Sequence, residues 1–230
     1  MENFSIRRKF RKKRIIMTYL FLGIQVIAFL LMTFMGGSQN TFTLYIFGAK
    51  VNEAIVMGEI WRLITPIFLH IGFMHLLINS ITLYYLGSQL ELTYGSIRFA
   101  IIYLLGGFMG NAMSFAFTPA ISAGASTSLF GLFAATVVLG RLYPHNYAIR
   151  NMAQGFLILI VINFISGLTS SSIDNWGHLG GAMGGGLAAC FIMIPNLAPI
   201  EKNIRIKMLI AYLLLAILFI AIGFRRFGMI

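Results

Sequence analysis

The stretch around which the chain is organised reads Gly124-Ala125-Ser126-Thr127-Ser128-Leu129-Phe130-Gly131. It lies where an irregular segment, residues 119–123, gives way to an apolar run that predicts a helix over 129–140. Small neighbours leave the Ser126 hydroxyl uncrowded, and the free N–H groups of a first helical turn stabilise negative charge beside it. An acyl-transfer nucleophile needs this combination. Small residues that open a buried helix more often indicate close packing, so this stretch alone leaves both interpretations open.

The composition places the chain among membrane proteins. Of its 230 residues, 59% are hydrophobic and 10% are charged, whereas a soluble domain is about half apolar and about a quarter charged. The net charge of +11 does not indicate nucleic-acid binding, because the basic residues lie between long apolar runs. Cys190 is the single cysteine, so no intrachain disulfide is possible, and its apolar surroundings predict a small core residue.

Seven apolar runs predict membrane helices. The first follows a basic start, as in a signal peptide, but it is about 20 residues long and lacks a cleavage motif, so we expect a spanning helix that stays in the protein. Residues 38–66 are too polar to span and too apolar to be free in water, which indicates an interfacial loop with short amphipathic helices. The runs cover residues 15–35, 67–87, 99–118, 126–140, 152–168, 177–194 and 208–224.

The fourth of these runs is short for a bilayer, at about 15 residues. A helix of this length cannot reach both surfaces, so Ser126 at its start is expected to lie below the outer surface. The loop before it must then dip into the membrane. Such a loop is tolerated only where protein or a water-filled cavity surrounds it, and the sequence predicts surroundings of that kind for Ser126.

The basic residues predict the orientation in the membrane. Seven spans place the two termini on opposite sides, and with a cytoplasmic N-terminus 13 of the 17 basic residues lie on the inner side. The positive-inside rule therefore predicts a cytoplasmic N-terminus and an external C-terminus. Arg225-Arg226, at the outer end of the last helix, is the discordant feature. The four basic residues left outside are Lys50, Arg62, Arg225 and Arg226.

Polar side chains inside apolar helices are costly, so each one is a functional candidate. His75 and Asn79 lie four residues apart, which places both on one helix face. His178 opens the sixth run. Because the second, fourth and sixth helices all have their N-terminal ends on the outer side, His75, Ser126 and His178 are expected at a similar depth. That shared depth strengthens the interpretation of Ser126 as a nucleophile.

Other interpretations of these histidines stay open. The pair of His75 and Asn79 can be interhelical glue, which is commonly worth about 1 kcal/mol. His70 lies near the outer end of the second run and is expected to be an interfacial or supporting residue rather than a catalytic one. A metal site of His70, His75 and His178 is disfavoured, because five-residue spacing takes His70 off the face of His75 and no carboxylate or thiolate is close in sequence.

The sixth run carries a stripe of glycines that predicts close helix packing. Gly177, Gly181 and Gly185 are spaced by four residues, so they share one helix face. Such a stripe lets two helix backbones approach closely. Packing of this kind can bring His178 to Ser126, because the fourth run also opens with small residues.

Five motifs follow one another between residues 61 and 181. They are Trp61-Arg62, His75-x-x-x-Asn79, Gly87-x-x-x-Glu91-x-x-x-Gly95, Gly124-Ala125-Ser126 and His178-x-x-Gly181. Together they resemble the rhomboid intramembrane serine proteases. The resemblance implies an all-α membrane protein with a rhomboid-like six-helix transmembrane bundle plus a seventh, C-terminal helix. The implied division is a basic cytoplasmic N-terminus over residues 1–14, the catalytic core over 15–194, and a cytoplasmic loop with the extra helix over 195–230.

The resemblance also implies the parts of an active site. Ser126 and His178 form the catalytic dyad, and the Ser126 backbone N–H, His75 and Asn79 form the oxyanion hole. Phe130, where the family often has tyrosine, stacks on the catalytic imidazole. The implied supporting residues are Phe130, Gly124, Gly181, Trp61, Arg62 and Glu91. Family members cleave transmembrane proteins near the membrane surface, so the implied partners are such substrates and the lipid bilayer, with no cofactor, metal or nucleic acid. The oligomeric state is not predicted.

One position departs from the family pattern, and another bears on whether the site is a dyad or a triad. Thr127 stands where the family commonly has glycine after the serine, and a β-branched residue is stiffer there, so rate or substrate range is expected to differ. Asp174 lies four residues before His178, the place for the third member of a triad. It belongs to a polar segment, residues 170–175, that reads as a loop at the outer rim. Its carboxylate is therefore expected to be hydrated and loosely held.

The rival interpretation is a non-catalytic rhomboid-like protein that binds membrane clients, with a transporter as a more distant third. Inactive relatives are expected to lose the serine or the histidine, whereas this chain keeps both Ser126 and His178. The sequence therefore favours an intramembrane serine endopeptidase that cleaves transmembrane substrates near the outer face of the cell membrane.

Overall fold

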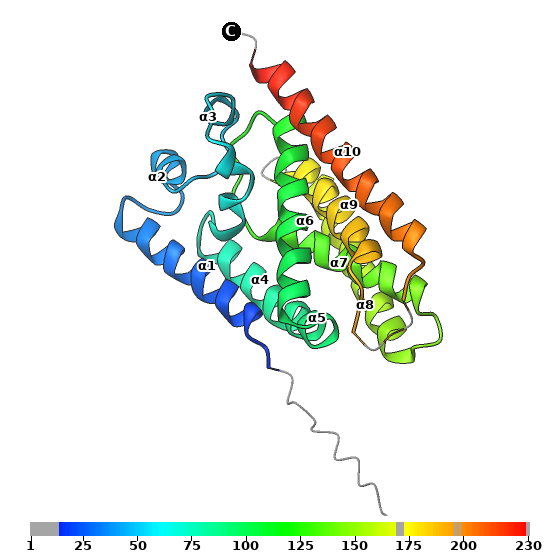
Figure 1. Ribbon diagram of the computed structural model, residues 1–230. Helices are drawn as coiled ribbons and strands as arrows, with labels where there is room; N and C mark the ends of the chain where they lie inside the picture. The colour runs from blue at the N-terminus through cyan, green and yellow to red at the C-terminus, as the bar shows by residue number, and fades with distance from the viewer. Residues whose placement is uncertain (1–13, 169–172, 196, 198, 229–230) are drawn as a thin grey trace, which may run out of the picture.

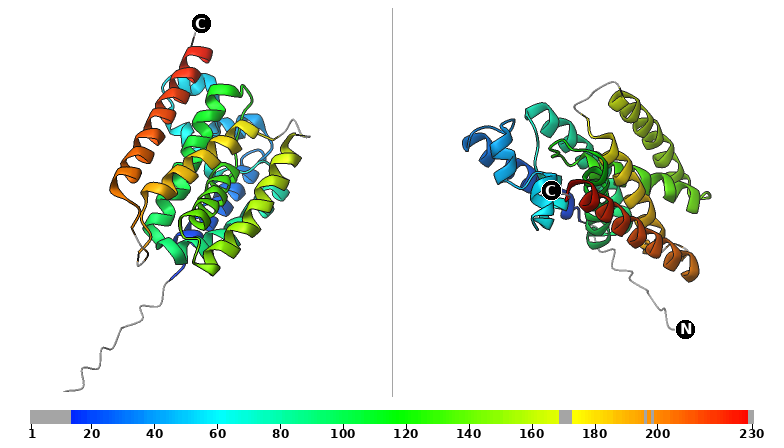
Figure 2. Two further views of the ribbon diagram at one scale, coloured as in Figure 1. Left: turned by 90° about the vertical axis from the view of Figure 1, so that its right-hand side faces the viewer. Right: turned by 90° about the horizontal axis from the view of Figure 1, so that it is seen from above.

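The computed structural model describes residues 14–168, 173–195, 197 and 199–228, with the backbone alone for residues 158–168. Within these ranges the chain is helical, without a strand, and a single isolated backbone bridge joins Lys50 and Ser122. Figures 1 and 2 show one bundle around a central helix, α6 (Ser96–Phe117). The expected all-α class is confirmed. The basic residues 7–13 and the serines 170–172 of the predicted outer rim lie outside the described residues.

Every apolar run of the sequence contains a helix of the bundle. These helices are α1 (Met17–Phe34), α4 (Phe73–Thr82), α6, α7 (Ser126–Leu142), α8 (Tyr147–Leu168), α9 (Asn175–Phe191) and α10 (Lys202–Phe227). The second begins later than predicted, because Leu69 is extended and Gly72 has a φ of 83°. It also continues through a π-helical turn, η3 (Leu83–Gly87), into α5 (Ser88–Tyr94). The predicted bounds of 67–87 are therefore wrong at both ends.

Three of the described helices, α1, α6 and α10, are long and apolar enough to cross a membrane. At 17 residues α7 is shorter, as its apolar run predicted. It lies inside the bundle against α6, α8 and α9 (Figure 1), so neighbouring helices rather than lipid surround it. In Figure 1, α1 begins at the lower end of the bundle and α10 ends at the upper end. The described chain thus starts and finishes at opposite ends of the bundle.

The close contact of α7 and α9 confirms the predicted glycine stripe. A side chain at Gly181 would place its Cβ 2.1 Å from the Thr127 carbonyl oxygen, and one at Gly185 would place it 2.2 Å from the Gly131 carbonyl oxygen. Non-bonded carbon atoms are best separated by about 3.5–4.0 Å, so neither position accepts even a methyl group without a shift of the backbone. Glycine therefore decides how closely these two helices meet.

The segment between α1 and α4, here called the interfacial loop after its predicted place, is a loop with short helices. They are α2 (Thr41–Ile46), α3 (Asn52–Val56) and the 3-10 turns η1 (Ile60–Leu63) and η2 (Thr65–Phe68). Arg62 holds the loop from inside, where its buried guanidinium pairs with Glu59 at 2.6 Å and donates to the Tyr45 and Ala49 carbonyl oxygens at 2.9 Å each. Trp61, beside it, is 53% exposed at the loop surface.

Glu91 fixes the start of α1 against the turn between α5 and α6. Its carboxylate accepts the backbone N–H groups of Ile16, Met17 and Thr18 at 2.7–2.8 Å, and the Ser96 hydroxyl donates to it as well. The first turn of a helix has free N–H groups and a positive dipole end, and a carboxylate there satisfies both. Glu91 therefore joins α1 to the rest of the bundle.

The extra helix α10 packs along α6 and α9. The Tyr212 hydroxyl donates to the Leu105 carbonyl oxygen at 2.9 Å. At the C-terminal end of α10, Arg226 donates to the carbonyl oxygens of Ala116 and Phe117 at 3.4 and 3.3 Å. These carbonyls end α6, where the helix dipole is negative. Arg226 therefore has a structural reason to stand where the positive-inside rule does not expect a cation.

Candidate active site

Ser126 is the first residue of α7, and the backbone just before it is held on two sides. The Gly124 N–H donates to the Pro66 carbonyl oxygen at 2.9 Å, and Ser122 exchanges two backbone hydrogen bonds with Lys50. Gly124 has a φ of +149°, and a side chain on it would place its Cβ 2.6 Å from an atom of a neighbouring imidazole, that of His75. Glycine is required at position 124 because the backbone φ is positive there and because a side chain would clash with the His75 ring.

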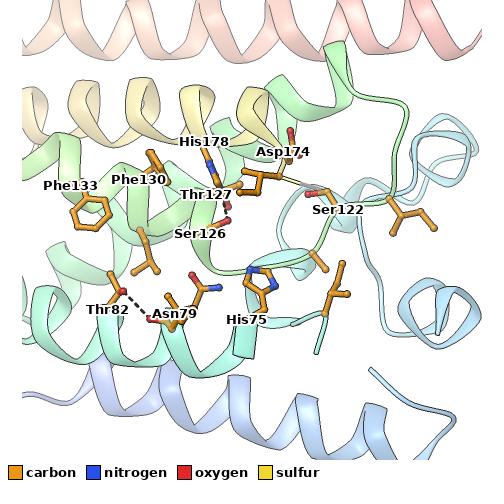
Figure 3. A pocket seen from close by; sticks show the side chains of 16 residues that line it. His75, Asn79, Thr82, Ser122, Ser126, Thr127, Phe130, Phe133, Asp174 and His178 are labelled. Carbon is orange, nitrogen blue, oxygen red and sulfur yellow. Dashed lines mark hydrogen bonds between the residues drawn. The ribbon is translucent and has the colours of Figure 1, made fainter. Parts of the chain in front are cut away.

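The Ser126 hydroxyl meets the imidazole of His178 across the contact between α7 and α9 (Figure 3). The Ser126 Oγ and His178 Nε2 atoms are 2.9 Å apart, which is a hydrogen-bond distance. His178 lies in the first turn of α9, three residues before Gly181 and its close contact with Thr127. The glycine stripe thus brings two side chains that are 52 residues apart in sequence into direct contact.

The His178 ring is oriented by an aromatic neighbour. The Phe130 and His178 rings stack with centroids 4.1 Å apart and planes at 10°. Phe130 is buried and lies four residues after Ser126, on the same face of α7. The His178 Nδ1 atom is buried and has no hydrogen-bond partner among the described residues. Ring contact, rather than a bond to a carboxylate, therefore sets the position of the imidazole.

The expectation of a loosely held Asp174 is wrong. This residue is the N-cap of α9, and its Oδ1 accepts the Gly177 backbone N–H at 2.8 Å. The Ser114 hydroxyl donates to Oδ2, and the Thr118 hydroxyl donates to Oδ1 at 3.3 Å. Asp174 thus fastens α9 to the end of α6, and none of these bonds involves His178. The local sequence gave no sign that Ser114 and Thr118 lie within reach.

His75 and Asn79 point into the space beside Ser126 (Figure 3). They lie one turn apart on α4, as their spacing predicted. Asn79 is 5% exposed, and its Nδ2 is buried without a hydrogen-bond partner among the described residues. An amide that joins two helices would have such a partner, so the arrangement favours a donor that faces the pocket over interhelical glue.

His70 lies behind these groups in a supporting position. It is fully buried, its Nε2 is 3.5 Å from the Ala125 backbone nitrogen, and its ring meets the His75 ring edge-on with centroids 5.2 Å apart. It contacts the backbone before Ser126 rather than the hydroxyl. In the part of the chain that the structure describes, no three residues of histidine, cysteine, aspartate or glutamate are grouped to hold a metal ion.

One pocket of about 480 Å³ is lined by Ser126, His178, His75 and Asn79. Its walls are mainly apolar, and these four residues are among its polar groups. Ligand pockets typically have about 300–1,000 Å³ and combine apolar walls with a few placed polar groups. The volume and lining therefore suit the binding of an extended peptide segment beside the hydroxyl. The apolar walls include Ile71, Ile78, Ile121, Leu129, Phe130 and Phe133.

Thr127, which stands where the resemblance expects glycine, fills the junction of three helices. A side chain at Gly110 would meet the Thr127 Cβ at 2.7 Å, and one at Gly177 would meet its Cγ2 at 3.2 Å. The Thr127 hydroxyl oxygen is buried and has no hydrogen-bond partner within the described ranges. The extra volume of this residue thus packs α7 against α6 and α9 directly beside Ser126.

The region that carries this geometry matches a known family. The Rhomboid domain model covers residues 57–196, which include His75, Asn79, Ser126 and His178. The chain belongs to the rhomboid family. It is 42% identical over 212 residues to Rhomboid protease GluP of Bacillus subtilis (strain 168), an alignment that spans 92% of this chain and 40% of that protein.

Other rhomboid relatives cover less of the chain. RHOMBOID-like protein 7 of Arabidopsis thaliana is 39% identical over 148 residues, which is 63% of this chain and 47% of the relative. Putative rhomboid protease YdcA of Bacillus subtilis is 33% identical over 136 residues, with shares of 58% and 68%. The chain thus spans less than half the length of the first two relatives.

Sequence reasoning missed the groups that hold this rhomboid site from outside. Ser114 and Thr118 of α6 and its C-cap bind Asp174, and Lys50 pairs with the segment before Ser126. Ser114 and Lys50 could have been noticed in the sequence, because Ser114 is a polar residue in a spanning run and Lys50 is a charged residue in a largely apolar loop. Their partners, however, are too distant in sequence for spacing to identify.

Proposed function

We propose that this rhomboid is an intramembrane serine protease that hydrolyses peptide bonds of transmembrane substrates. The observation that carries the proposal is the 2.9 Å contact between Ser126 Oγ and His178 Nε2 in the wall of a pocket that also presents His75 and Asn79. A nucleophile, a base within hydrogen-bond reach and donors near both are the parts that acyl transfer requires. The relative named Rhomboid protease GluP supports the same activity.

In the proposed reaction, Ser126 Oγ attacks the scissile carbonyl carbon while His178 Nε2 takes the hydroxyl proton. The tetrahedral intermediate collapses as the C–N bond breaks, and the imidazolium gives its proton to the leaving amine. Ser126 then carries an acyl ester. Water attacks that ester, His178 takes the proton of the water and returns it to Ser126 Oγ, and the second product leaves as a carboxylic acid.

The developing oxyanion is stabilised by three donors. They are the backbone N–H of Ser126 in the first turn of α7, the His75 ring and the Asn79 Nδ2. The unpaired Asn79 amide supports this role, because a donor that already faces the pocket needs no reorganisation when charge develops. The positive end of the α7 dipole adds to the same field.

The imidazole is held in a dyad rather than a triad. Phe130 supplies the orientation by stacking, while the nearest carboxylate in sequence, Asp174, is engaged with α6 and the first turn of α9. Burying a carboxylate in a membrane interior has a high free-energy cost, so an aromatic ring orients a histidine there with less destabilisation.

Cleavage takes place near the outer membrane face. Ser126 starts a helix of 17 residues that is too short to reach both surfaces, so it lies below the outer surface if the N-terminus is cytoplasmic. The distribution of 13 of 17 basic residues on the inner side supports that orientation. The substrate is then a transmembrane protein that enters the pocket from the bilayer with its scissile bond near the external end of its helix.

The decisive experiment combines covalent labelling with cleavage of a transmembrane reporter. A serine-directed fluorophosphonate should label the wild-type protein, and Ser126→Ala should abolish both labelling and cleavage. His178→Ala should also abolish cleavage while the protein still inserts and folds. Full cleavage by either variant would end the protease proposal. A wild-type protein that retains clients but neither labels nor cleaves would instead be the non-catalytic client-binding protein.

A further inference from the structure

A lysine outside the machinery described above carries its charge inside the protein. Lys50 follows α2 in the interfacial loop, and its side chain is 0% exposed. A buried ammonium is costly unless hydrogen bonds satisfy it. The groups that accept hydrogen bonds from the Lys50 ammonium therefore indicate which part of the protein this lysine stabilises.

Two of the three acceptors of the Lys50 ammonium belong to the segment that leads to Ser126. Nζ donates to the carbonyl oxygens of Thr118 and Ala120 at 2.8 and 2.7 Å, and to the Asn52 side-chain oxygen at 3.1 Å. An ammonium has three donors, and all three are used. The Asn52 side-chain nitrogen donates to the same Thr118 carbonyl oxygen at 2.9 Å, so this carbonyl accepts two hydrogen bonds from the interfacial loop.

The backbone of Lys50 holds the same segment a second time. The Lys50 N–H donates to the Ser122 carbonyl oxygen at 2.9 Å, and the Ser122 N–H donates to the Lys50 carbonyl oxygen at 3.2 Å. Residues 118–123 lie between the end of α6 and the start of α7 and form no helix of their own. Thr118 is also bonded to Ser114 and Asp174, but beyond Thr118 the hydrogen bonds of Ala120 and Ser122 go to Lys50.

Residues 118–123 end in one wall of the candidate active-site pocket. Ile121, Ser122 and Ala123 line the pocket, and Ser122 lies across it from Asn79 in Figure 3. The contact between Ser126 and His178 instead rests on the packing of α7 against α9. A displaced segment would thus change the shape offered to a substrate and leave the dyad in place.

A cation suits this location electrostatically. Thr118 is the C-cap of α6, where carbonyl oxygens are free and the helix dipole is negative. Burial lowers the pKa of Lys50 to about 8, and the carboxylates of Asp174 and Glu53 oppose that shift. The ammonium form, with all three donors, therefore predominates at neutral pH.

We propose that Lys50 is a positioning residue that holds the pocket wall of residues 118–123 in the shape that receives the substrate. The proposal rests on the proposed protease function. Lys50 is not a catalytic base, because its Nζ is occupied by three acceptors, none of which is Ser126 or His178. Its effect falls on substrate binding and alignment, not on the reactivity of the serine.

The test compares two identical replacements. Lys50→Met keeps the length of the side chain and removes the ammonium, whereas Lys202→Met makes the same change at an exposed position at the start of α10. For a transmembrane reporter, Lys50→Met should raise KM and lower kcat/KM about 10–100-fold, because a misplacement of about 1 Å can cost about 10²-fold. Its rate of fluorophosphonate labelling at Ser126 should stay close to wild type. Lys202→Met should match wild type in both measurements.

Hydrogen exchange gives a readout that does not depend on activity. In Lys50→Met, the backbone amides of residues 118–124 should exchange faster, while the first turn of α9 keeps its protection. Asn52→Leu removes one acceptor of the ammonium and one donor to Thr118, so it should show the same pattern more weakly. This second variant keeps the test available if Lys50→Met does not fold.

Each contrary outcome is informative. Parallel loss of labelling and cleavage would overturn the proposal, because Lys50 would then support the dyad or the whole fold. Unchanged cleavage, or unchanged exchange over residues 118–124, would overturn it too. If the wild-type protein neither labels nor cleaves, the protease function fails, and the exchange measurement alone decides whether Lys50 holds this wall.

Discussion

Ser126 and His178 meet at 2.9 Å, and the other ring nitrogen of His178 has no hydrogen-bond partner in the described part of the chain. The Phe130 ring lies against the face of the imidazole, and Asp174 serves instead as the N-cap of α9. At the scale of residues, therefore, orientation of the imidazole and attachment of its helix are separate functions of separate side chains. Substitutions at the two positions should have different consequences.

Asp174→Asn should keep cleavage within about tenfold of wild type, because asparagine also serves as an N-cap and can still accept the Gly177 N–H. Phe130→Ala should lose more, since it frees the imidazole, and Phe130→Tyr, which keeps the ring, is its control. Loss of a true triad aspartate costs about 10⁴-fold. The measurement is the initial cleavage rate of each variant in the same liposomes. A loss of a thousandfold in Asp174→Asn beside an unaffected Phe130→Ala would show that the dyad assignment is wrong.

His75→Ala and Asn79→Ala should lower the turnover number and leave the nucleophile present. Removal of one oxyanion donor costs on the order of 10²–10³-fold in favourable cases, and less where donors share the load. Thr82→Val is a matched control, because Thr82 lines the same pocket but its hydroxyl donates to the Ile78 carbonyl oxygen of its own helix. Wild-type cleavage rates in both alanine variants would show that His75 and Asn79 only hold helices together and do not stabilise the oxyanion.

At the scale of elements, the C-terminal end of α6 is where three other parts of the chain attach. Asp174 binds it from α9, Lys50 from the interfacial loop and Arg226 from α10. A helix end has free carbonyl groups and a negative dipole, so two of the three attachments are cations. This arrangement gives α10 a structural role, because it holds the helix to which both α9 and the pocket wall are fastened.

The contact between α7 and α9 should be the element most sensitive to added volume. In Gly181→Ala the new Cβ would lie 2.1 Å from the Thr127 carbonyl oxygen, so α9 must move away and carry His178 with it. We expect at least about 10²-fold slower cleavage, since a shift of about 1 Å has that effect, together with a lower Tm. Gly186→Ala is the matched control, because its Cβ would meet its nearest neighbours at 3.7 Å. Equal rates and equal Tm in the two variants would contradict the role of this contact.

At the scale of the whole molecule, the short helix α7 lies inside the bundle, packed against α6, α8 and α9. The helices α1, α6 and α10 are long enough to cross a bilayer, and α7 lies among its neighbours inside the bundle. Ser126 therefore stands within the protein at the end of α7, with a pocket of about 480 Å³ beside it. Such a recess lets a hydrolytic site lie at membrane depth, because its polar groups face a cavity rather than lipid.

The orientation of the bundle is open to a direct test. The N-terminus should be cytoplasmic and the C-terminus external, because that arrangement leaves 13 of 17 basic residues inside. A tag that is readable only from outside the cell should report when placed after Ile230 and stay silent before Met1. The reverse pattern would refute the charge argument, and equal readings at both ends would refute the odd number of spans.

The sequence by itself determined the membrane class, the order of the helices and the residue types of the site. Apolar runs, helical spacing and charge distribution depend on residues close together in the chain, so they could be read without a structure. The four-residue spacing of His75 and Asn79 and the glycine stripe that ends near Gly185 are examples. The predicted bounds of the second helix were wrong, because Gly72 has a positive φ and the loop before α4 ends later than the apolar pattern suggests.

Only the tertiary structure decided which side chains meet. The bond of Ser126 to His178 spans 52 residues, that of Ser114 to Asp174 spans 60, and that of Lys50 to Ala120 spans 70. Such contacts depend on how closely helices pack and how they are turned, which a periodic pattern does not contain. Asp174 shows the physical reason. Its spacing from His178 predicts the helix face on which it lies, but only the hydroxyl groups at the end of α6 decide that its carboxylate is held in place.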